Sequence, residues 1–218
     1  MTFRAVFFDF DYTLGDAGEA IVAGFQYAFQ RMGLPTPERE AIRRTIGMVL
    51  QDGYTVLSGD SSPEGREEFR RLYVEKAVPL QIEGTKLFPG AAELLAALHE
   101  AGIPAGLVST KSTGTLRSVL EARGVLHLLA SITGGDLVSK PKPDPEGLLA
   151  AIAAQGLRPE EVLFCGDTVI DGETAQRAGT HFCAVLNGTT TADDFQAAGL
   201  PRDHVSPDLW DLKAWLGL

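Results

Sequence analysis

The chain has 218 residues, of which 44% are hydrophobic and 22% are charged, so it is long enough to bury a sizeable core. Its 29 acidic residues outnumber its 19 Lys and Arg residues, which gives a formal net charge of -10. This balance argues against a nucleic-acid partner, because a general nucleic-acid binder needs basic surface to meet phosphates. It remains compatible with a small phosphorylated metabolite that is held by a local positive site.

Cysteine usage and the N-terminal residues bear on the compartment. Cys165 and Cys183 each lie inside an apolar run, which favours reduced core thiols over a disulfide and predicts a cytoplasmic protein. The first apolar run is short, contains Asp9 and Asp11, and lacks a small-residue cleavage site. We therefore expect no signal peptide, no membrane span and no membrane partner.

Strand-like runs alternate with helix-like stretches along most of the chain. The expected strands are residues 5–10, 105–109, 131–133, 162–165 and 181–186. The expected helices are residues 89–101, 113–123, 145–155, 171–178 and 208–216, and residues 187–194 are an expected loop. Gly102, Gly124, Gly156 and Gly179 follow four of these helices, where glycine is favoured. The alternation predicts an α/β fold with a Rossmann-like parallel sheet and helices on both faces.

Residues 15–83 break this alternation. They show helical periodicity at 21–32, 38–50 and 64–77, and the turn residues 59–63 precede the third stretch. No strand signal comparable to those elsewhere occurs in this segment. We predict an inserted α-helical cap domain at residues 15–83 and a core domain made of residues 1–14 and 84–218.

Asp9 and Asp11 are two positions apart at the end of the first apolar run. In an extended chain, side chains at i and i+2 point to the same face, so both carboxylates are expected to lie together. Two like charges at that distance repel, which requires a cation or a functional reason for both to stay ionised. The pair is thus a candidate for metal binding and catalysis, and the alternative is a pair of acids that cap a turn.

Three more segments provide partners for this pair. A second apolar strand ends at Asp167, and Asp171 follows four residues later. Ser109 and Thr110 follow another strand, and residues 140–145 form a Pro-rich turn with two lysines. Because ligands of parallel sheets bind beyond the carboxyl ends of the strands, we expect Asp9, Ser109 and Asp167 to meet at one edge.

These four segments, in this order, closely resemble the motifs of the haloacid dehalogenase (HAD) superfamily of aspartate-nucleophile phosphatases. The resemblance runs from Phe3 to about Val185, and it is narrowest with the phosphoglycolate-phosphatase-like branch, which has a helical cap called C1. It implies that Asp9 is the nucleophile and that Asp11 is the general acid and base. It also implies that Ser109 and Thr110 bind the substrate phosphate.

The resemblance further implies a lysine that balances the charge of Asp9 and the phosphate. The spacing of the family's motifs favours Lys140, with Lys142 in the same turn as the alternative. Asp9, Asp11, Asp167 and Asp171 would hold Mg²⁺, which suits carboxylate, carbonyl and water oxygens. Two of the site candidates have structural alternatives: Asp171 as an acid at a helix N-terminus, and Ser109 as a polar strand end or a helix N-cap.

One position departs from the family and another separates its branches. Tyr12 stands where glycine is commonest, so loop packing beside the site is expected to differ. Asp11 favours phosphate chemistry over carbon–halogen cleavage, since an alkoxide needs a proton to leave and a halide does not. In the cap, Arg43, Arg44, Thr45 and Gly47 are candidates for substrate selection, although a solvated helix face explains the arginines equally well.

We therefore expect a Mg²⁺-dependent phosphatase that hydrolyses a small phosphate monoester through an aspartyl-phosphate intermediate. A phosphosugar mutase of the β-phosphoglucomutase type is the first alternative, since it would share Asp9 and Asp11. A non-catalytic binding protein on the same scaffold is the second.

Overall fold

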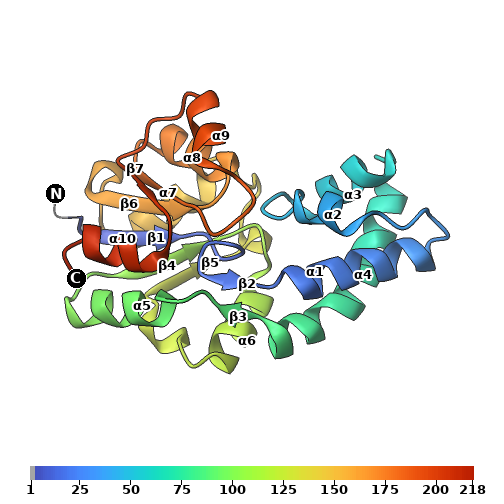
Figure 1. The fold of residues 1–218 in the computed structure, drawn as a ribbon, viewed down its shortest axis with the longest axis horizontal. Helices are drawn as coiled ribbons and strands as arrows, with labels where there is room; N and C mark the ends of the chain where they lie inside the picture. Colours follow the sequence, from blue (N-terminus) through green and yellow to red (C-terminus); the bar gives the residue numbers. More distant parts are fainter. Residues whose placement is uncertain (1–2) are drawn as a thin grey trace.

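In the computed structural model, which describes residues 3–218, a parallel sheet with its helices adjoins a separate group of helices (Figure 1). The six strands of the sheet are β1 (Ala5–Phe8), β4 (Ala105–Val108), β5 (Ser131–Thr133), β6 (Val162–Gly166), β7 (His181–Val185) and β8 (His204–Ser206). Their order is β5-β4-β1-β6-β7-β8, and every neighbouring pair is parallel. The predicted parallel α/β core is confirmed.

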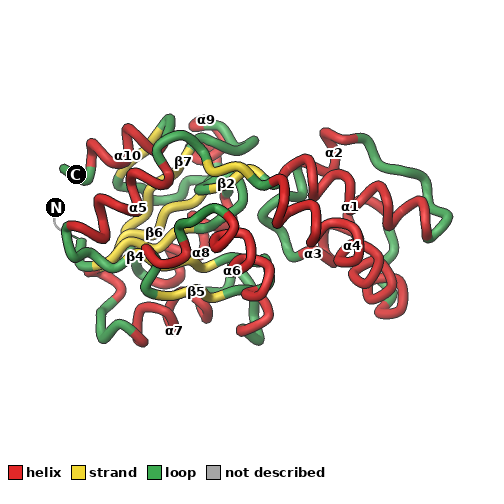
Figure 2. Tube along the Cα trace, turned by 90° about the horizontal axis from the view of Figure 1, so that it is seen from below, coloured by secondary structure: helices red, strands yellow, loops and turns green. Residues whose placement is uncertain are grey.

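The sheet is covered on both faces because its strands are apolar on both faces. Phe8 belongs to a hydrophobic cluster with residues of α5 (Ala91–Glu100), α6 (Thr113–Ala122) and α10 (Leu209–Trp215). The neighbouring Phe7 points the other way, toward α7 (Glu146–Ala154), α8 (Val169–Ala178) and α9 (Ala192–Ala197). Both rings are almost fully buried, as expected for a strand enclosed between two helical layers (Figure 2). Three short 3₁₀ helices, Leu126–Leu128, Gly135–Leu137 and Pro159–Glu161, complete this part.

The second part consists of α1 (Gly18–Arg31), α2 (Arg39–Arg43), α3 (Leu50–Ser58) and α4 (Pro63–Gly84). These helices enclose a hydrophobic cluster of their own, in which Tyr54 stacks on Phe69 at 4.8 Å between ring centroids. Ser62 caps the first turn of α4 and Pro63 occupies its first position, where a missing N–H costs nothing. Because this cluster is separate from those of the sheet, we propose residues 15–83 as a cap domain.

The chain passes between the two parts at a two-stranded antiparallel ribbon. It is formed by β2 (Gly15–Asp16) and β3 (Lys86–Leu87). The backbone N–H of Phe88 also donates to the carbonyl of Leu14 at 3.0 Å. The outgoing and returning segments are therefore hydrogen-bonded to each other.

Most predicted elements are present, with ends displaced by a few residues. The glycines after α5, α6, α7 and α8 all adopt the left-handed conformation, with φ between 66° and 75°. The expected helix at 38–50 is wrong: α2 ends at Arg43, and helix resumes only at Leu50. The reason is Gly47, whose φ of 96° lies outside helical backbone.

Two C-terminal features were not predicted. The strand β8 carries the polar residues His204 and Ser206, so its sequence lacks an apolar run. The expected loop at 187–194 contains the start of α9, which begins after Thr191. There, the hydroxyl of Thr191 and the carboxylate of Asp194 cap the first turn reciprocally.

Candidate active site

The sheet order brings the predicted residues to one edge. Asp9 follows β1, and Ser109 and Asp167 follow the two strands that flank it, β4 and β6. The backbone N–H of Asp9 donates to Cys165 at 2.9 Å, and that of Ser109 donates to Thr133 at 3.0 Å. The last hydrogen bonds of the sheet thus fix the backbone of the site, and the expected gathering at one edge is confirmed.

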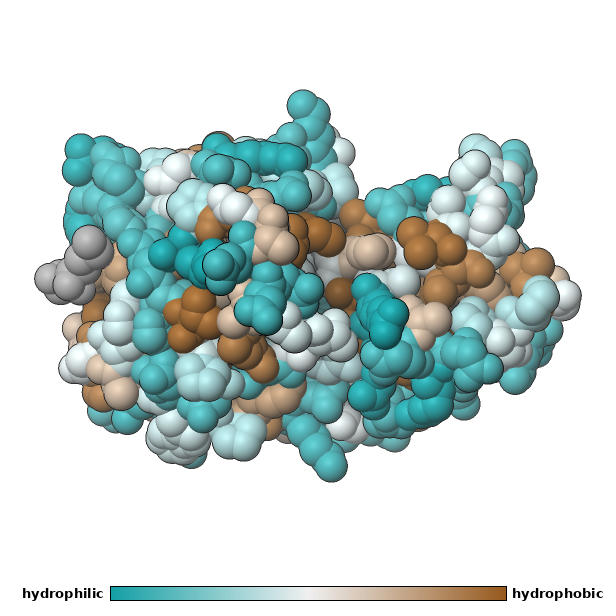
Figure 3. All heavy atoms as spheres, turned by 45° about the horizontal axis from the view of Figure 1, so that its top comes forward, coloured by the Kyte–Doolittle hydropathy of each residue, from teal (hydrophilic) through white to brown (hydrophobic). Residues whose placement is uncertain are grey.

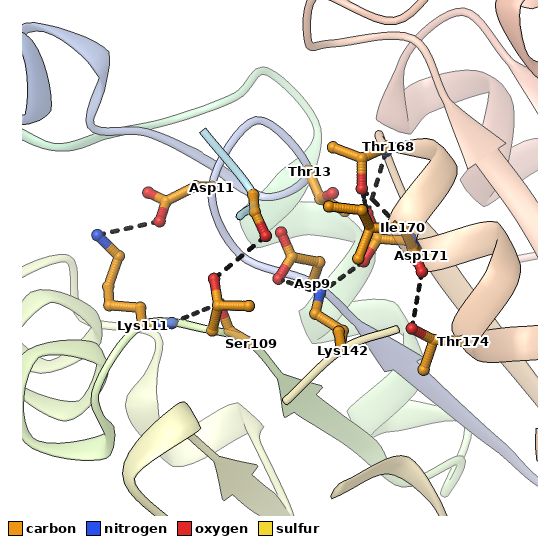
Figure 4. Close-up of polar contacts among 12 residues, drawn as sticks. Asp9, Asp11, Thr13, Ser109, Lys111, Lys142, Thr168, Ile170, Asp171 and Thr174 are labelled. Carbon is orange, nitrogen blue, oxygen red and sulfur yellow. Dashed lines mark hydrogen bonds and ion pairs between the residues drawn. The ribbon is translucent and has the colours of Figure 1, made fainter. Parts of the chain in front are cut away.

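The lysine beside the nucleophile candidate is Lys142. Its Nζ lies 2.8 Å from Asp9 Oδ1 and 2.5 Å from Asp171 Oδ1, so the ammonium group joins both carboxylates (Figure 4). Burial alone would lower the pKa of Lys142, but Asp171 and Asp9 more than offset this and raise it. Lys142 is therefore a permanent positive charge in the site.

The prediction that Lys140 occupies this position is wrong. Lys140 is exposed, and its backbone N–H donates to Glu146 at 3.1 Å. Both lysines belong to one Pro-rich turn, and only the path of that turn decides which side chain enters the site. Lys142 is 8% exposed, and its ammonium group lies 5.6 Å from the ring centroid of Phe164 on β6.

Asp9 lies in an environment that disfavours its charge. It is 2% exposed, and burial raises its pKa from 3.8 to about 6. Lys142 acts against this rise, while the negative charges of Asp171 and Asp11 add to it. At neutral pH the carboxylate is ionised and desolvated, which are the two properties of an activated nucleophile.

Asp9, Asp167 and Asp171 form a group of buried acids. One oxygen from each lies within 4.8 Å of the other two. Burial, followed by the charges of Asp171 and Asp9, raises the pKa of Asp167 well above its usual range. Thr13 donates to Asp167 Oδ1 at 3.1 Å, but one hydrogen bond from a neutral hydroxyl offsets little of the buried negative charge. A hard divalent cation fits this donor set.

The members of this group differ in how much of their carboxylate is free for a metal. Asp171 accepts from Lys142 through Oδ1 and from the Thr168 hydroxyl at 2.6 Å through Oδ2. Its other role, as the N3 acid of a capping box at α8, is also observed. The side chain of Asp11 is not part of the group. Its expected role as a ligand therefore rests on its backbone carbonyl.

The carboxylate of Asp11 points away from the buried acids, toward Lys111 (Figure 4). Lys111 Nζ lies 3.0 Å from Asp11 Oδ2 and also contacts Gln81 Oε1 on α4. Gln81 Nε2 in turn donates to the hydroxyl of Tyr73 at 3.0 Å. Asp11 Oδ1 is buried without a hydrogen-bond partner among the described residues. A hydrogen-bond donor on a substrate would satisfy this oxygen in the ionised carboxylate, and an acceptor would pair with it in the protonated form.

The loop of Asp9 and Asp11 closes in a tight turn. The carbonyl of Phe10 accepts from the backbone N–H groups of Leu14 and Gly15 at 2.9 and 3.0 Å. Tyr12 lies in this turn with φ of 58°, the only positive φ of a non-glycine residue in the described chain. This conformation explains why glycine is commonest here in the family, and the buried Tyr12 ring adopts it at some cost in strain.

The loop between α2 and α3 touches the site from the cap. The Thr110 hydroxyl donates to the carbonyl of Gly47 at 3.4 Å. A Cβ at Gly47 would lie 2.9 Å from Thr168 Cγ2, so only glycine permits both this φ and this approach. Ser109 is 6% exposed, and its Oγ accepts from the Lys111 backbone N–H at 3.4 Å.

A cavity of about 420 Å³ lies between this loop, α1, α4 and the core. Asp11, Thr110 and Lys111 form its core side. Of the four candidate selecting residues, Thr45 and Gly47 line it. Arg43 and Arg44 do not line it: the half-buried Arg43 pairs with Glu19, and the exposed Arg44 pairs with Glu40. Figure 3 shows hydrophobic side chains where the two parts of the molecule meet.

Sequence reasoning missed three residues of the site. Thr13 is the threonine of the Asp-x-Asp-x-Thr pattern, so its position was visible, but its contact with Asp167 was not. Lys111 directly follows Ser109 and Thr110, yet a lysine in a loop has no distinguishing signal. Asn187 Nδ2 donates to the carbonyl of Thr13 at 3.1 Å from the far end of the chain.

Comparison with known proteins agrees with this geometry. The family model described as haloacid dehalogenase-like hydrolase matches residues 6–185. A phosphoglycolate phosphatase of Salmonella typhimurium is 31% identical, with 99% of this chain and 93% of that protein covered. An N-acetylmuramic acid 6-phosphate phosphatase of Pseudomonas putida is 33% identical, with 89% of this chain and 87% of that protein covered.

Solved structures are similar over nearly the whole chain. A protein from Bacteroides fragilis, assigned as a haloacid dehalogenase-like hydrolase, has a TM-score of 0.93 at 37% identity. That match covers 97% of this chain and 100% of the other. The chain belongs to the haloacid dehalogenase-like hydrolase family, and with phosphatases among its relatives it is a phosphoric monoester hydrolase. Within residues 3–218, no helix combines the length and apolarity that a membrane crossing requires.

Proposed function

We propose that the chain is a Mg²⁺-dependent phosphatase that hydrolyses a small phosphate monoester through an aspartyl phosphate on Asp9. The observation that carries this proposal is the contact between Lys142 and Asp9 at 2.8 Å, beside two further buried acids. A buried carboxylate next to a fixed cation can approach a dianionic phosphate, which an isolated carboxylate would repel.

In the first step, Asp9 attacks phosphorus and the bond to the ester oxygen breaks. Asp11 donates its proton to that oxygen, so the alcohol leaves uncharged. In the second step, Asp11 accepts a proton from water, whose oxygen attacks phosphorus and releases Asp9 and inorganic phosphate. Asp11 lines the cavity, and its Oδ1 has no hydrogen-bond partner among the described residues, so this oxygen remains available for both transfers.

The remaining residues hold the phosphate and its charge. Lys142 offsets negative charge on Asp9 and on the phosphoryl oxygens. Ser109 would donate its hydroxyl to a phosphate oxygen, and Thr110 would donate its backbone N–H. Asp9 and Asp167 would hold Mg²⁺ together with the Asp11 carbonyl. Asp171, four residues after Asp167, would support the binding of this ion. Bound Mg²⁺ would neutralise phosphate charge during the transfer.

The relatives support a phosphatase rather than a phosphosugar mutase, because those with 31% and 33% identity are both phosphatases by name. A cytoplasmic location, which the two buried free thiols suggest, remains a prediction.

The test is phosphate release from 4-nitrophenyl phosphate with Mg²⁺ and with excess EDTA. We expect release with Mg²⁺ and none with EDTA. Full activity in EDTA would remove the metal from the proposal. Conversion of a sugar 1-phosphate to the 6-phosphate, without free phosphate, would indicate the mutase.

A further inference from the structure

We infer that the alcohol released from the substrate is uncharged, larger than glycolate, and apolar over much of its surface. This inference rests on the proposed function and names the substrate class of the same site. It is carried by the cavity beside Asp11, through its position, its size, the character of its walls and the pairing of its charges.

The position of the cavity assigns it to the leaving group. The phosphate must meet Asp9, which does not line the cavity, whereas Asp11, the proton donor to the leaving oxygen, does. Thr110 and Lys111 continue the same wall from the core. The part of the substrate beyond the ester oxygen therefore extends from Asp11 toward the cap.

The volume exceeds what a two-carbon acid would fill. The cavity measures about 420 Å³, within the range of roughly 300–1,000 Å³ that encloses drug-sized ligands. A glycolate group would leave most of this space to water and would touch few cap residues. Contact with the cap from the site requires a longer alcohol.

The cap side of the cavity is mainly apolar. Its lining residues include Phe25 on α1, Ile46, Met48 and Val49 in the loop before α3, and Val74 and Val78 on α4. Removing such side chains from water is favourable only against apolar ligand surface. Thr45, Gln51 and Gln81 add a few uncharged polar groups, which would orient a hydroxyl or an amide.

The charged side chains that line the cavity already have polar partners within the protein. Lys111 Nζ lies 3.0 Å from Asp11 Oδ2 and also contacts Gln81 Oε1, so its ammonium group keeps two oxygen partners when Asp11 carries the proton that the first step needs. Arg70 pairs with Glu67 through two hydrogen bonds of 2.9 and 2.6 Å. Asp136 accepts from the backbone N–H and the hydroxyl of Thr113 at 2.6 and 2.9 Å. Among residues 3–218, no other charged residue lines the cavity. A substrate carboxylate would thus find no cation without oxygen partners of its own and would lose hydration on entry.

The test compares three alkyl phosphates with Mg²⁺: propyl phosphate, 3-phenylpropyl phosphate and 2-phosphoglycolate. The first two leave as primary alcohols of similar reactivity, so their ratio measures the cavity and not the chemistry. We expect kcat/KM for 3-phenylpropyl phosphate to exceed both others at least tenfold. Equal values for the two alkyl esters, or preference for 2-phosphoglycolate, would overturn the inference.

A variant pair checks that the cavity is responsible. Val78→Lys places an unpaired cation in the cavity and should lower the preference for 3-phenylpropyl phosphate over 2-phosphoglycolate at least tenfold. Val56→Lys is the matched control, because Val56 is 65% exposed and lies outside the cavity lining. An unchanged preference in Val78→Lys, or an equal change in the control, would refute the assignment. No release from any ester, 4-nitrophenyl phosphate included, would instead refute the proposed function.

Discussion

The ammonium group of Lys111 lies 3.0 Å from Asp11 and also contacts Gln81 on the cap helix α4. Asp11, which is expected to transfer the proton, is therefore held by the Lys111 side chain, and Lys111 also contacts the cap. Lys111→Met removes the ion pair and leaves Asp11 free to change rotamer. We expect kcat for an alkyl phosphate to fall by roughly tenfold to a hundredfold, because misplaced acids lose most of their effect. Steady-state kinetics of the variant, with Lys140→Met as the exposed control, test this. A kcat equal to that of the control would show that the pair is not used.

Lys142 and Lys140 provide a second contrast. Lys142→Met leaves Asp9 and Asp171 buried without their cation, which typically costs about 3–5 kcal/mol in stability and also removes a catalytic charge. We expect a loss of at least a hundredfold in kcat, about 2.7 kcal/mol, and a lower melting temperature. Lys140→Met should change either quantity little, since exposed substitutions are usually neutral. The opposite ranking would restore Lys140 to the role that the sequence suggested.

Stability without metal should depend on Asp9 in a defined pH window. Its pKa rises from 3.8 in an unfolded chain to about 6 in the fold. Between these values the folded state binds more protons than the unfolded state, so the contribution of Asp9 to stability falls as pH rises. Above the upper value the contribution is constant. Urea unfolding in EDTA across this window, for wild type and Asp9→Asn, isolates the effect. We expect the stability difference, wild type minus variant, to decrease with pH. A flat or rising difference contradicts the raised pKa.

Mg²⁺ should stabilise the fold through Asp167. Burial and neighbouring acids disfavour its charge, so Asp167→Asn should match or exceed the wild type in melting temperature when EDTA is present. With free Mg²⁺ at 100 times Kd, the wild type should gain about 2.7 kcal/mol, and the variant much less. Thermal unfolding with and without Mg²⁺ measures both. Equal Mg²⁺ shifts in the two proteins would exclude Asp167 as a ligand.

The substitutions Asp9→Asn and Asp11→Asn should block the reaction at different steps. Asp9→Asn has no attacking carboxylate, so no phosphoenzyme forms on that residue. Asp11→Asn keeps the nucleophile but loses the base for water attack, so it should accumulate phosphoenzyme from an ester whose leaving group needs no proton. Intact-mass measurement after rapid quench should show one added phosphoryl group on Asp11→Asn alone. A label on Asp9→Asn, or on another residue of Asp11→Asn by peptide analysis, would overturn the mechanism.

The sequence predicted the sheet and its acids because both depend on local patterns. Apolar strands that end in polar residues specify where Asp9, Ser109 and Asp167 lie, since parallel strands share one carboxyl edge. The identity of the lysine depends on how a Pro-rich turn folds over Phe164, and spacing along the chain carries no information about that. The sequence also failed to predict the loop between α2 and α3. Its apolar residues line the cavity, and their spacing resembles that of a helix.

At Tyr12 the sequence departs from the family pattern, and the structure shows what that departure does to the backbone. The residue was conspicuous because glycine is commonest at that position in the family. Its φ of 58° shows that the backbone keeps the conformation that favours glycine, so the turn is retained despite the larger side chain.

The antiparallel ribbon of β2 and β3 brings the two ends of the helical insertion side by side. A different insertion could therefore be grafted between Gly15 and Leu87 without changing the order of the six core strands. A short turn joining the same two residues would give a capless protein. If the insertion contacts the leaving group, as we propose, its exchange at this single junction should change substrate choice and leave the catalytic residues of the core in place.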